Sequence, residues 1–160
     1  MCHQCDYSEL LKSCELGVTR NRLCVLEIIG SHNFPLSAAE IYKTLGHNIS
    51  INRVTVYRIL DLLVARGLVQ RLSGGGRTFV YGLAPSDYHP AHPHFYCKRC
   101  GHMECLKPQS LNVDTKPMQR TFAGLIENIE VRVDGVCHTC LQRRQRAKDE
   151  ASYTRFSRIY

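Results

Sequence analysis

Two Cys-x-x-Cys pairs, Cys97 with Cys100 and Cys137 with Cys140, constrain the fold of this chain more than any other feature. A Cys-x-x-Cys turn places two thiolates close enough to bind one ion, and two such turns supply the four sulfurs of a tetrahedral zinc site. Such a site can hold a small domain folded. The alternative is a redox-active pair, but that chemistry expects one Cys-x-x-Cys within a βαβ pattern. The sequence therefore predicts one structural zinc ion bound by these four cysteines.

The composition is that of one large domain or two small ones. Of the 160 residues 44% are hydrophobic, and no apolar run approaches the roughly 20 residues of a membrane span. The N-terminus shows no basic patch followed by an apolar segment, so no signal peptide is expected. Nine cysteines without such a signal favour reduced, metal-bound thiols, and we expect a cytoplasmic protein with no membrane partner. The net charge of +7 permits nucleic-acid binding without proving it.

The first half of the chain reads as helices followed by a hairpin. Helix caps and apolar periodicity predict four helices. The first runs from Ser8 to Leu16, and the second is capped by Thr19 and runs to Ile29. The third begins with the capping box Ser37–Glu40 and ends at Gly46, and the fourth runs from near Ser50 or Asn52 to Ala65. Strand-like runs at Leu68–Leu72 and Thr78–Leu83 follow, joined by the glycine-rich segment Ser73–Arg77. This order predicts a winged helix-turn-helix, in which the last helix enters the major groove of DNA.

The expected geometry supplies candidate DNA contacts. Arg20, Arg22 and Arg77 are candidates for phosphate contacts, whereas Arg53 and Tyr57 are candidates for base contacts. A helical domain with a solvated charged face is the alternative, and the pattern alone leaves both readings open.

The second half reads as a small α/β unit stapled by metal. After Pro85 the composition shifts to His, Pro and Tyr, which indicates a linker. Short strands are predicted at Phe95–Cys97, Met103–Leu106 and Ile129–Val133, and a helix from Thr115 to about Ala123. The basic tail, Gln142–Lys148, is expected to be either a frayed helix or disordered. The fold class is therefore α+β, with a winged-helix domain in residues 1–84, a linker in 85–94, an α/β domain in 95–141 and a basic tail in 142–160.

These residues together resemble the ferric uptake regulator family of metal-dependent transcriptional repressors. The matching segments are Gly17–Arg22, Leu36–Tyr42, Thr55–Arg58, Gly67–Val69, His92–Gly101 and Cys137–Cys140. The resemblance implies a homodimer that binds a palindromic double-stranded DNA operator, with structural zinc on the four cysteines. It also implies that the segment Thr55–Arg58 binds DNA: Thr55 is a candidate contact, and Tyr57 and Arg58 contact a base and the backbone.

The resemblance further implies a sensory metal site between the domains. Its ligands include both histidines of the His-x-His motif, His92 and His94. A further ligand is the residue five positions past Cys100, the second cysteine of the first Cys-x-x-Cys pair. Relatives have an acidic residue there, and this chain has Cys105. Two other family ligands are missing, because Pro35 stands where relatives place a histidine and no acid or cysteine ends the wing strand. We therefore expect His89 to be the fourth ligand.

The expected donor set favours zinc at the sensory site. A thiolate with imidazoles suits Zn²⁺, whereas carboxylates with imidazoles suit Fe²⁺ or Mn²⁺. The alternatives are an iron or peroxide sensor of the same family, with Cys105 as a packed strand residue. A third family site is expected to be absent, because Ala91, Pro93 and Ile129 stand at its ligand positions.

Functions outside this family are less well supported by the sequence. A thiol oxidoreductase or zinc hydrolase would need an open metal position and a general base, and no HExxH or comparable motif is present, so no enzyme activity and no small organic substrate are expected. A metal-buffering module that has lost its operator is a third possibility, which the intact Thr55–Arg58 segment disfavours. His102 and His138 are expected to be exposed. His32 and the N-terminal Cys2, His3 and Cys5 are left open as further metal ligands.

Overall fold

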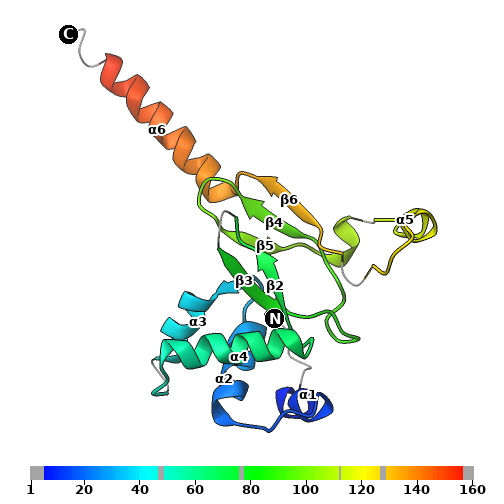
Figure 1. The fold of residues 1–160 in the computed structure, drawn as a ribbon. Coiled ribbons are helices and arrows are strands. Elements are labelled where there is room, and N and C mark those ends of the chain that lie inside the picture. The colour runs from blue at the N-terminus through cyan, green and yellow to red at the C-terminus, as the bar shows by residue number, and fades with distance from the viewer. Residues whose placement is uncertain (1–5, 47–48, 76–77, 112, 127–128, 157–160) are drawn as a thin grey trace.

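A computed structural model of the protein describes residues 6–46, 49–75, 78–111, 113–126 and 129–156. The helices of the N-terminal domain are α1 (Tyr7–Ser13), α2 (Arg20–Ser31), α3 (Ala38–Leu45) and α4 (Arg53–Ala65), and its strands are β1 (Leu36–Ser37), β2 (Val69–Ser73) and β3 (Phe79–Leu83). The C-terminal domain contains β4 (His94–Cys97), β5 (Met103–Cys105), the short 3-10 helix η1 (Pro108–Ser110), α5 (Lys116–Thr121), β6 (Arg132–Gly135) and α6 (His138–Phe156). Figure 1 shows α1 to α4 gathered at one end of the molecule, while α6 projects from the other.

Side-chain caps set where the helices of the N-terminal domain begin. The Thr19 side chain accepts a hydrogen bond from the backbone of α2, and Asn52 does the same for α4. Ser37 and Glu40 form the expected capping box, in which the Glu40 carboxylate accepts from the Ser37 backbone at 2.8 Å. These local hydrogen bonds satisfy amide groups that have no partner within the helix.

The apolar faces of the four helices meet in one core. Its largest buried side chains include Leu11, Leu26, Ile41, Leu45, Leu60 and Leu63. Within α4 the buried positions are Val56, Ile59, Leu60 and Leu63, as the helical spacing predicts. Burial on this face leaves Tyr57 and Arg58 on the opposite, exposed face of the same helix.

The predicted hairpin forms a wing, but with a third strand that the sequence pattern did not indicate. Strands β2 and β3 pair antiparallel over five residue pairs, from Val69 opposite Leu83 to Ser73 opposite Phe79. Two residues of β1 extend the sheet to the order β1-β3-β2. Such a short strand has no periodicity of its own, because its pairing depends entirely on β3.

The C-terminal domain corrects two expectations. Strand β6 spans Arg132–Gly135 rather than Ile129–Val133, because it pairs in parallel with β4 up to the level where Cys97 lies opposite Gly135. The tail is one helix, α6, as the first of the two alternatives predicts, but it begins at His138 within the second Cys-x-x-Cys rather than after it. The predicted helix at Thr115 is present but shorter, as α5. Within the described ranges, every helix is too short or too polar to cross a bilayer.

Candidate functional site

The four cysteines of the two Cys-x-x-Cys turns come together at the junction of β4 and α6. We call these turns the first knuckle (Cys97–Cys100) and the second knuckle (Cys137–Cys140). Their sulfur atoms all lie within 4.8 Å of one another, although the two pairs come from distant parts of the chain. Cys97 ends β4, and Cys140 lies in the first turn of α6; both are buried. Gly101, with φ of +73°, closes the first knuckle turn. Four converging sulfurs are the donor set of a structural zinc site, so these residues fit the metal that their spacing predicts.

The protonation of this cluster is divided between its thiols. The backbone N–H of Cys137 donates to the Cys97 sulfur at 3.3 Å, and this hydrogen bond lowers the pKa of the Cys97 thiol to about 6. Burial raises the pKa of Cys140 to about 12. A divalent ion bound by the sulfurs would lower the pKa of every ligand thiol, Cys140 included, because it stabilises the thiolate form.

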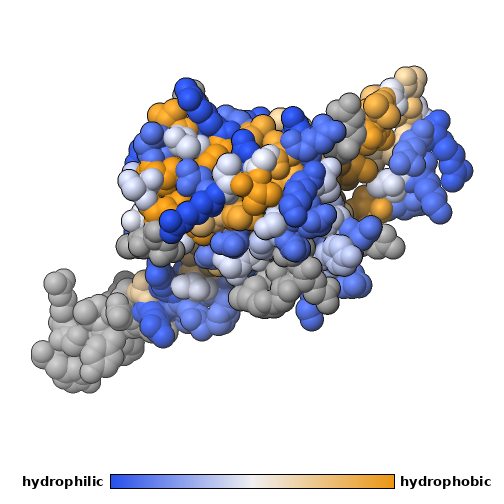
Figure 2. Space-filling model, turned by 90° about the horizontal axis from the view of Figure 1, so that it is seen from below, coloured by the Kyte–Doolittle hydropathy of each residue, from blue (hydrophilic) through white to orange (hydrophobic). Residues whose placement is uncertain are grey.

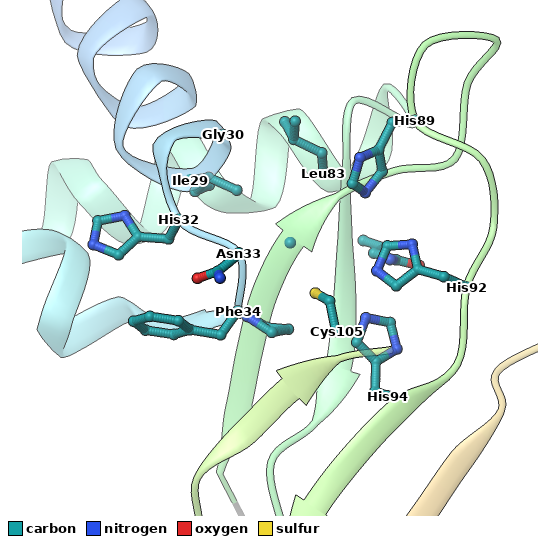
Figure 3. A pocket seen from close by; sticks show the side chains of 13 residues that line it. Ile29, Gly30, His32, Asn33, Phe34, Leu83, His89, His92, His94 and Cys105 are labelled. Carbon is teal, nitrogen blue, oxygen red and sulfur yellow. The ribbon is translucent and has the colours of Figure 1, made fainter. Parts of the chain in front are cut away.

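A second potential metal cluster lies between the two domains and consists of His92, His94 and Cys105. One ligand atom of each lies within 4.8 Å of the other two. His94 is the first residue of β4 and Cys105 the last of β5, and these two residues are direct cross-strand partners. Figure 3 shows the three side chains converging, with His92 reaching in from the linker. The structure therefore brings together three of the four residues that the sequence assigns to the sensory site.

The hydrogen bonds of His92 leave one ring nitrogen free for a metal. Its Nδ1 lies 3.0 Å from the Pro90 carbonyl oxygen, and because a carbonyl can only accept, Nδ1 carries the proton. The lone pair is therefore on Nε2, which is buried without a hydrogen-bond partner, as is Nδ1 of His94. Buried nitrogen atoms without partners are costly unless a ligand satisfies them. A histidine oriented by a backbone carbonyl is typical of metal sites, and sequence reasoning missed Pro90 in this role.

Burial favours the uncharged forms of His94 and Cys105. It lowers the pKa of His94 to about 4, with smaller contributions from His92 and His89, and it raises the pKa of the Cys105 thiol to about 11. The imidazole is therefore ready to bind a cation at neutral pH, whereas the thiol must lose its proton on binding.

Walls from both domains enclose this cluster. The cluster lines one side of a cavity of about 90 Å³. The N-terminal domain supplies the other side from the end of α2, the segment before β1 and the end of β3. The lining residues from this domain include Ile29, Gly30, Asn33, Phe34, Pro35 and Leu83. The cluster is therefore closed only while the two domains lie together as they do in Figure 3.

The other candidate histidines lie outside the cluster. The His89 ring lies 5.0 Å from that of His92, but its nitrogen atoms are not part of the three-residue group. His32 points away from the cluster in Figure 3, and its Nδ1 lies 2.8 Å from the Ile28 carbonyl oxygen. His102 and His138 are exposed, as expected. Cys2, His3 and Cys5 are outside the described residues.

Some of the candidate DNA-contact side chains are exposed to solvent, and others contact neighbouring residues of the same domain. Tyr57 and Arg58 are exposed on α4, and Arg20 is exposed at the start of α2. The Arg53 guanidinium lies over the Tyr42 ring at 5.5 Å, and Arg22 donates to the Gly17 carbonyl oxygen at 2.6 Å. Thr55 donates its hydroxyl proton to the Asn52 cap at 2.9 Å, so its visible role is at the start of the helix. Arg77 lies outside the described residues.

Comparisons with known proteins agree with the fold. The model of the ferric uptake regulator family matches residues 13–132. A ferric uptake regulation protein of Legionella pneumophila is 30% identical over 139 residues, which cover 84% of this chain and 98% of the relative. The structure resembles the ferric uptake regulator of Vibrio cholerae, with a TM-score of 0.65, 27% identity and coverage of 82% of this chain and 100% of that one. It also resembles the peroxide stress regulator of Campylobacter jejuni, with a TM-score of 0.61, 28% identity and coverage of 85% and 100%. The chain therefore belongs to the ferric uptake regulator family of metal-responsive transcriptional regulators.

Proposed function

We propose that this protein is a zinc-responsive repressor that binds a palindromic operator as a metal-loaded homodimer. Structural zinc on Cys97, Cys100, Cys137 and Cys140 holds the C-terminal domain, and the cluster of His92, His94 and Cys105 senses the regulatory metal. The observation that carries the proposal is a thiol at Cys105 opposite two buried imidazole nitrogens that have no other partner.

The donor set supports zinc as the regulatory ion. A thiolate with two imidazoles is a borderline-soft set that suits Zn²⁺, whereas Fe²⁺ and Mn²⁺ sites are richer in carboxylate oxygen. No carboxylate belongs to the three-residue group among the described residues. Three protein ligands leave a fourth tetrahedral position, and His89, whose ring lies beside that of His92, is the nearest candidate.

Operator binding is assigned to α4. Its N-terminal turns expose Arg53, Tyr57 and Arg58, and the Asn52 cap fixes where the helix begins. Arg20 and Arg22 at the start of α2 are the proposed phosphate contacts, with Arg77 from the wing. This division follows the usual arrangement, in which a recognition helix reads bases while flanking groups bind phosphates.

A second copy of the chain is the proposed cover for the apolar surface of the C-terminal domain. No residue of α5 is buried, and the segments around it expose Leu111, Val113, Met118, Phe122 and Leu125. Figure 2 shows apolar surface on the lobe at the right of the view, where Figure 1 places α5. Apolar side chains this exposed on one small lobe are typical of an interface.

The residues of the sensory cluster couple metal to domain orientation. His92 belongs to the linker that leaves the wing, whereas His94 and Cys105 belong to the rigid sheet of the C-terminal domain. A bound divalent ion would tie these parts together through two neutral imidazoles and one thiolate. The linker is then held against the sheet, which limits the orientations that the N-terminal domain can adopt. Metal favours the DNA-binding arrangement to the extent that it binds that arrangement more tightly.

The experiment compares wild type with His92→Ala, using His138→Ala as the matched control because His138 is exposed, lies outside the cluster and contacts Gln142 on its own helix. Duplexes are first selected from a random-sequence pool with zinc-loaded wild type, and binding is then measured with zinc, Fe²⁺ and Mn²⁺. We expect zinc to stimulate binding by wild type and His138→Ala but not by His92→Ala, while all three retain one structural zinc ion. Stimulation by Fe²⁺ or Mn²⁺ at lower free concentration than zinc would contradict the zinc assignment.

A further inference from the structure

The wing makes a second contact with the C-terminal domain, away from the metal cavity. Leu72 and Val80 are cross-strand partners on the wing, and Tyr96 and Met103 are cross-strand partners on β4 and β5. These four side chains pack together in an apolar cluster that is separate from the main core. The wing therefore buries part of its surface against the other domain.

Arg132 of β6 adds a polar contact to this apolar one. Its Nη1 donates to the carbonyl oxygen of Ser73, the last residue of β2, at 3.2 Å. The guanidinium is oriented by Asp134, which accepts from Nε at 2.8 Å and from Nη2 at 3.3 Å, and it lies 5.2 Å from the centre of the Tyr96 ring. Asp134 and the Tyr96 ring thus orient the arginine toward the wing backbone at Ser73.

Gly75 allows the wing tip to approach this closely. Its φ of +84° belongs to the left-handed region, and a Cβ at this position would collide with the Tyr96 hydroxyl. The backbone of the wing tip therefore lies directly against the Tyr96 ring.

The wing contact and the metal ligands share one face of the same small sheet. His94 and Tyr96 are two residues apart on β4, and Met103 and Cys105 are two residues apart on β5, so each pair points to the same side. The ligands occupy one end of this face, and the wing contact occupies the other. The cavity walls from α2 and β3 close over the ligands in the same arrangement of domains that docks the wing.

We propose that Tyr96 and Arg132 are positioning residues that dock the wing on the C-terminal sheet, and that this contact is linked to metal binding at His92, His94 and Cys105. Because the docked arrangement also encloses the cluster, docking raises the affinity for the regulatory metal, and the metal in turn stabilises docking. The two effects are equal by reciprocity, since both reflect one coupling free energy. The inference rests on the proposed metal site but not on which DNA sequence is bound.

The test measures zinc affinity of the sensory site by chelator competition, without DNA, in protein that retains structural zinc. Arg132→Gln removes the contact from the sheet side, and Val80→Ser weakens it from the wing side. Neither change replaces a ligand, but Arg132 is the cross-strand partner of His94, so Val80→Ser, on the wing, is the deciding variant. We expect each to weaken zinc binding by about 5-fold or more, the lower end of typical coupling between sites. The double variant should lose less than the product of the single effects, because both changes break one contact.

Arg71→Gln is the matched control, because Arg71 is also a wing arginine but is exposed and lies over Phe79 rather than against the sheet. It should leave zinc affinity unchanged. Hydrogen exchange adds a direct reading of docking: zinc should slow exchange in residues 72–75 of wild type and of Arg71→Gln, but not of Arg132→Gln.

The outcomes separate this inference from the proposed function. Zinc affinities within twofold of wild type in both Arg132→Gln and Val80→Ser would overturn the linkage while leaving the sensory site intact. An equal loss in Arg71→Gln would also overturn it, because the effect would then not depend on the docking contact. Wild type that binds no second metal ion would remove the proposed function and the linkage together.

Discussion

His94 and Cys105 face each other as cross-strand partners on β4 and β5, which brings an imidazole and a thiol to one buried cavity. Their spacing is fixed by the backbone of a sheet, which the first zinc knuckle closes at its other end. Two ligands of the proposed sensory site are thus positioned by strand pairing rather than by loops. The chemical identity of residue 105 can therefore be changed with little effect on where its side chain lies.

Replacing Cys105 should change which metal the site prefers. Cys105→Ser should abolish the thiolate-to-Co²⁺ absorption band of the second site and weaken zinc binding. Cys105→Asp should keep a site but shift its preference toward Mn²⁺ and Fe²⁺, because carboxylate oxygen is a harder donor. Metal titrations followed by absorbance check both. Cys24→Ser is the control, because Cys24 packs against the core of the N-terminal domain. Identical affinities in wild type and Cys105→Ser would return Cys105 to a packing role.

Removing one knuckle thiol should unfold the C-terminal domain selectively. Cys100→Ser should lose the structural zinc, because three sulfurs remain, and the loss should extend to α6, whose first turn carries Cys140. The N-terminal core contains none of these residues and should stay folded. Zinc content and thermal unfolding followed by circular dichroism test this. A variant with full zinc content and an unchanged melting curve would contradict the assignment.

Two neighbouring residues of α4 should affect DNA binding differently. Arg58→Ala should weaken binding to all duplexes alike and reduce the salt dependence by about one phosphate contact, a slope change of roughly 0.9. Tyr57→Ala should cost about 1–3 kcal/mol on the preferred duplex and relax selectivity at one base step. Binding isotherms at several salt concentrations separate the two effects. Unchanged affinity in both variants would exclude α4 as the recognition helix.

The Asn52 cap should contribute measurably to the stability of the recognition helix. The Asn52 side chain accepts from the Thr55 backbone at 2.8 Å, and its loss in Asn52→Ala should cost about 1 kcal/mol of unfolding free energy. Denaturant unfolding of the N-terminal domain measures this. Ser50→Ala, which changes an exposed residue two positions earlier, should cost much less. Equal losses in the two variants would mean that the cap is not the source of the effect.

The parts of the molecule that could be predicted from the sequence are those fixed by local chemistry. The helix starts could be predicted because each cap side chain accepts a hydrogen bond from a backbone amide three residues later. These caps are Thr19, Ser37 and Asn52. Cys-x-x-Cys spacing and resemblance to the family likewise predicted two groups, the four cysteines and His92 with His94 and Cys105, whose side chains lie together in the structure.

Contacts between distant segments were not readable in the same way. The pairing of β1 with β3 and the reach of Arg132 to Ser73 join residues far apart in the chain, and neither has a local signal. The register of β6 also depends on its partner β4, which explains why the predicted strand began too early. His89 was expected in the cluster because of its place in the linker, but its ring lies beside His92 rather than among the ligand atoms.

The separation of the two knuckles along the chain has a consequence for synthesis on the ribosome. Cys97 and Cys137 are 40 positions apart, and the strand β6, which completes the sheet beside β4, lies just before the second knuckle. The N-terminal core contains no residue beyond Leu83 and can form while the rest is still being translated. With the four thiols binding zinc as proposed, the C-terminal domain closes only after Cys140 has emerged and an ion has been bound. On that proposal, the zinc available at that moment limits how much nascent chain becomes a complete regulator.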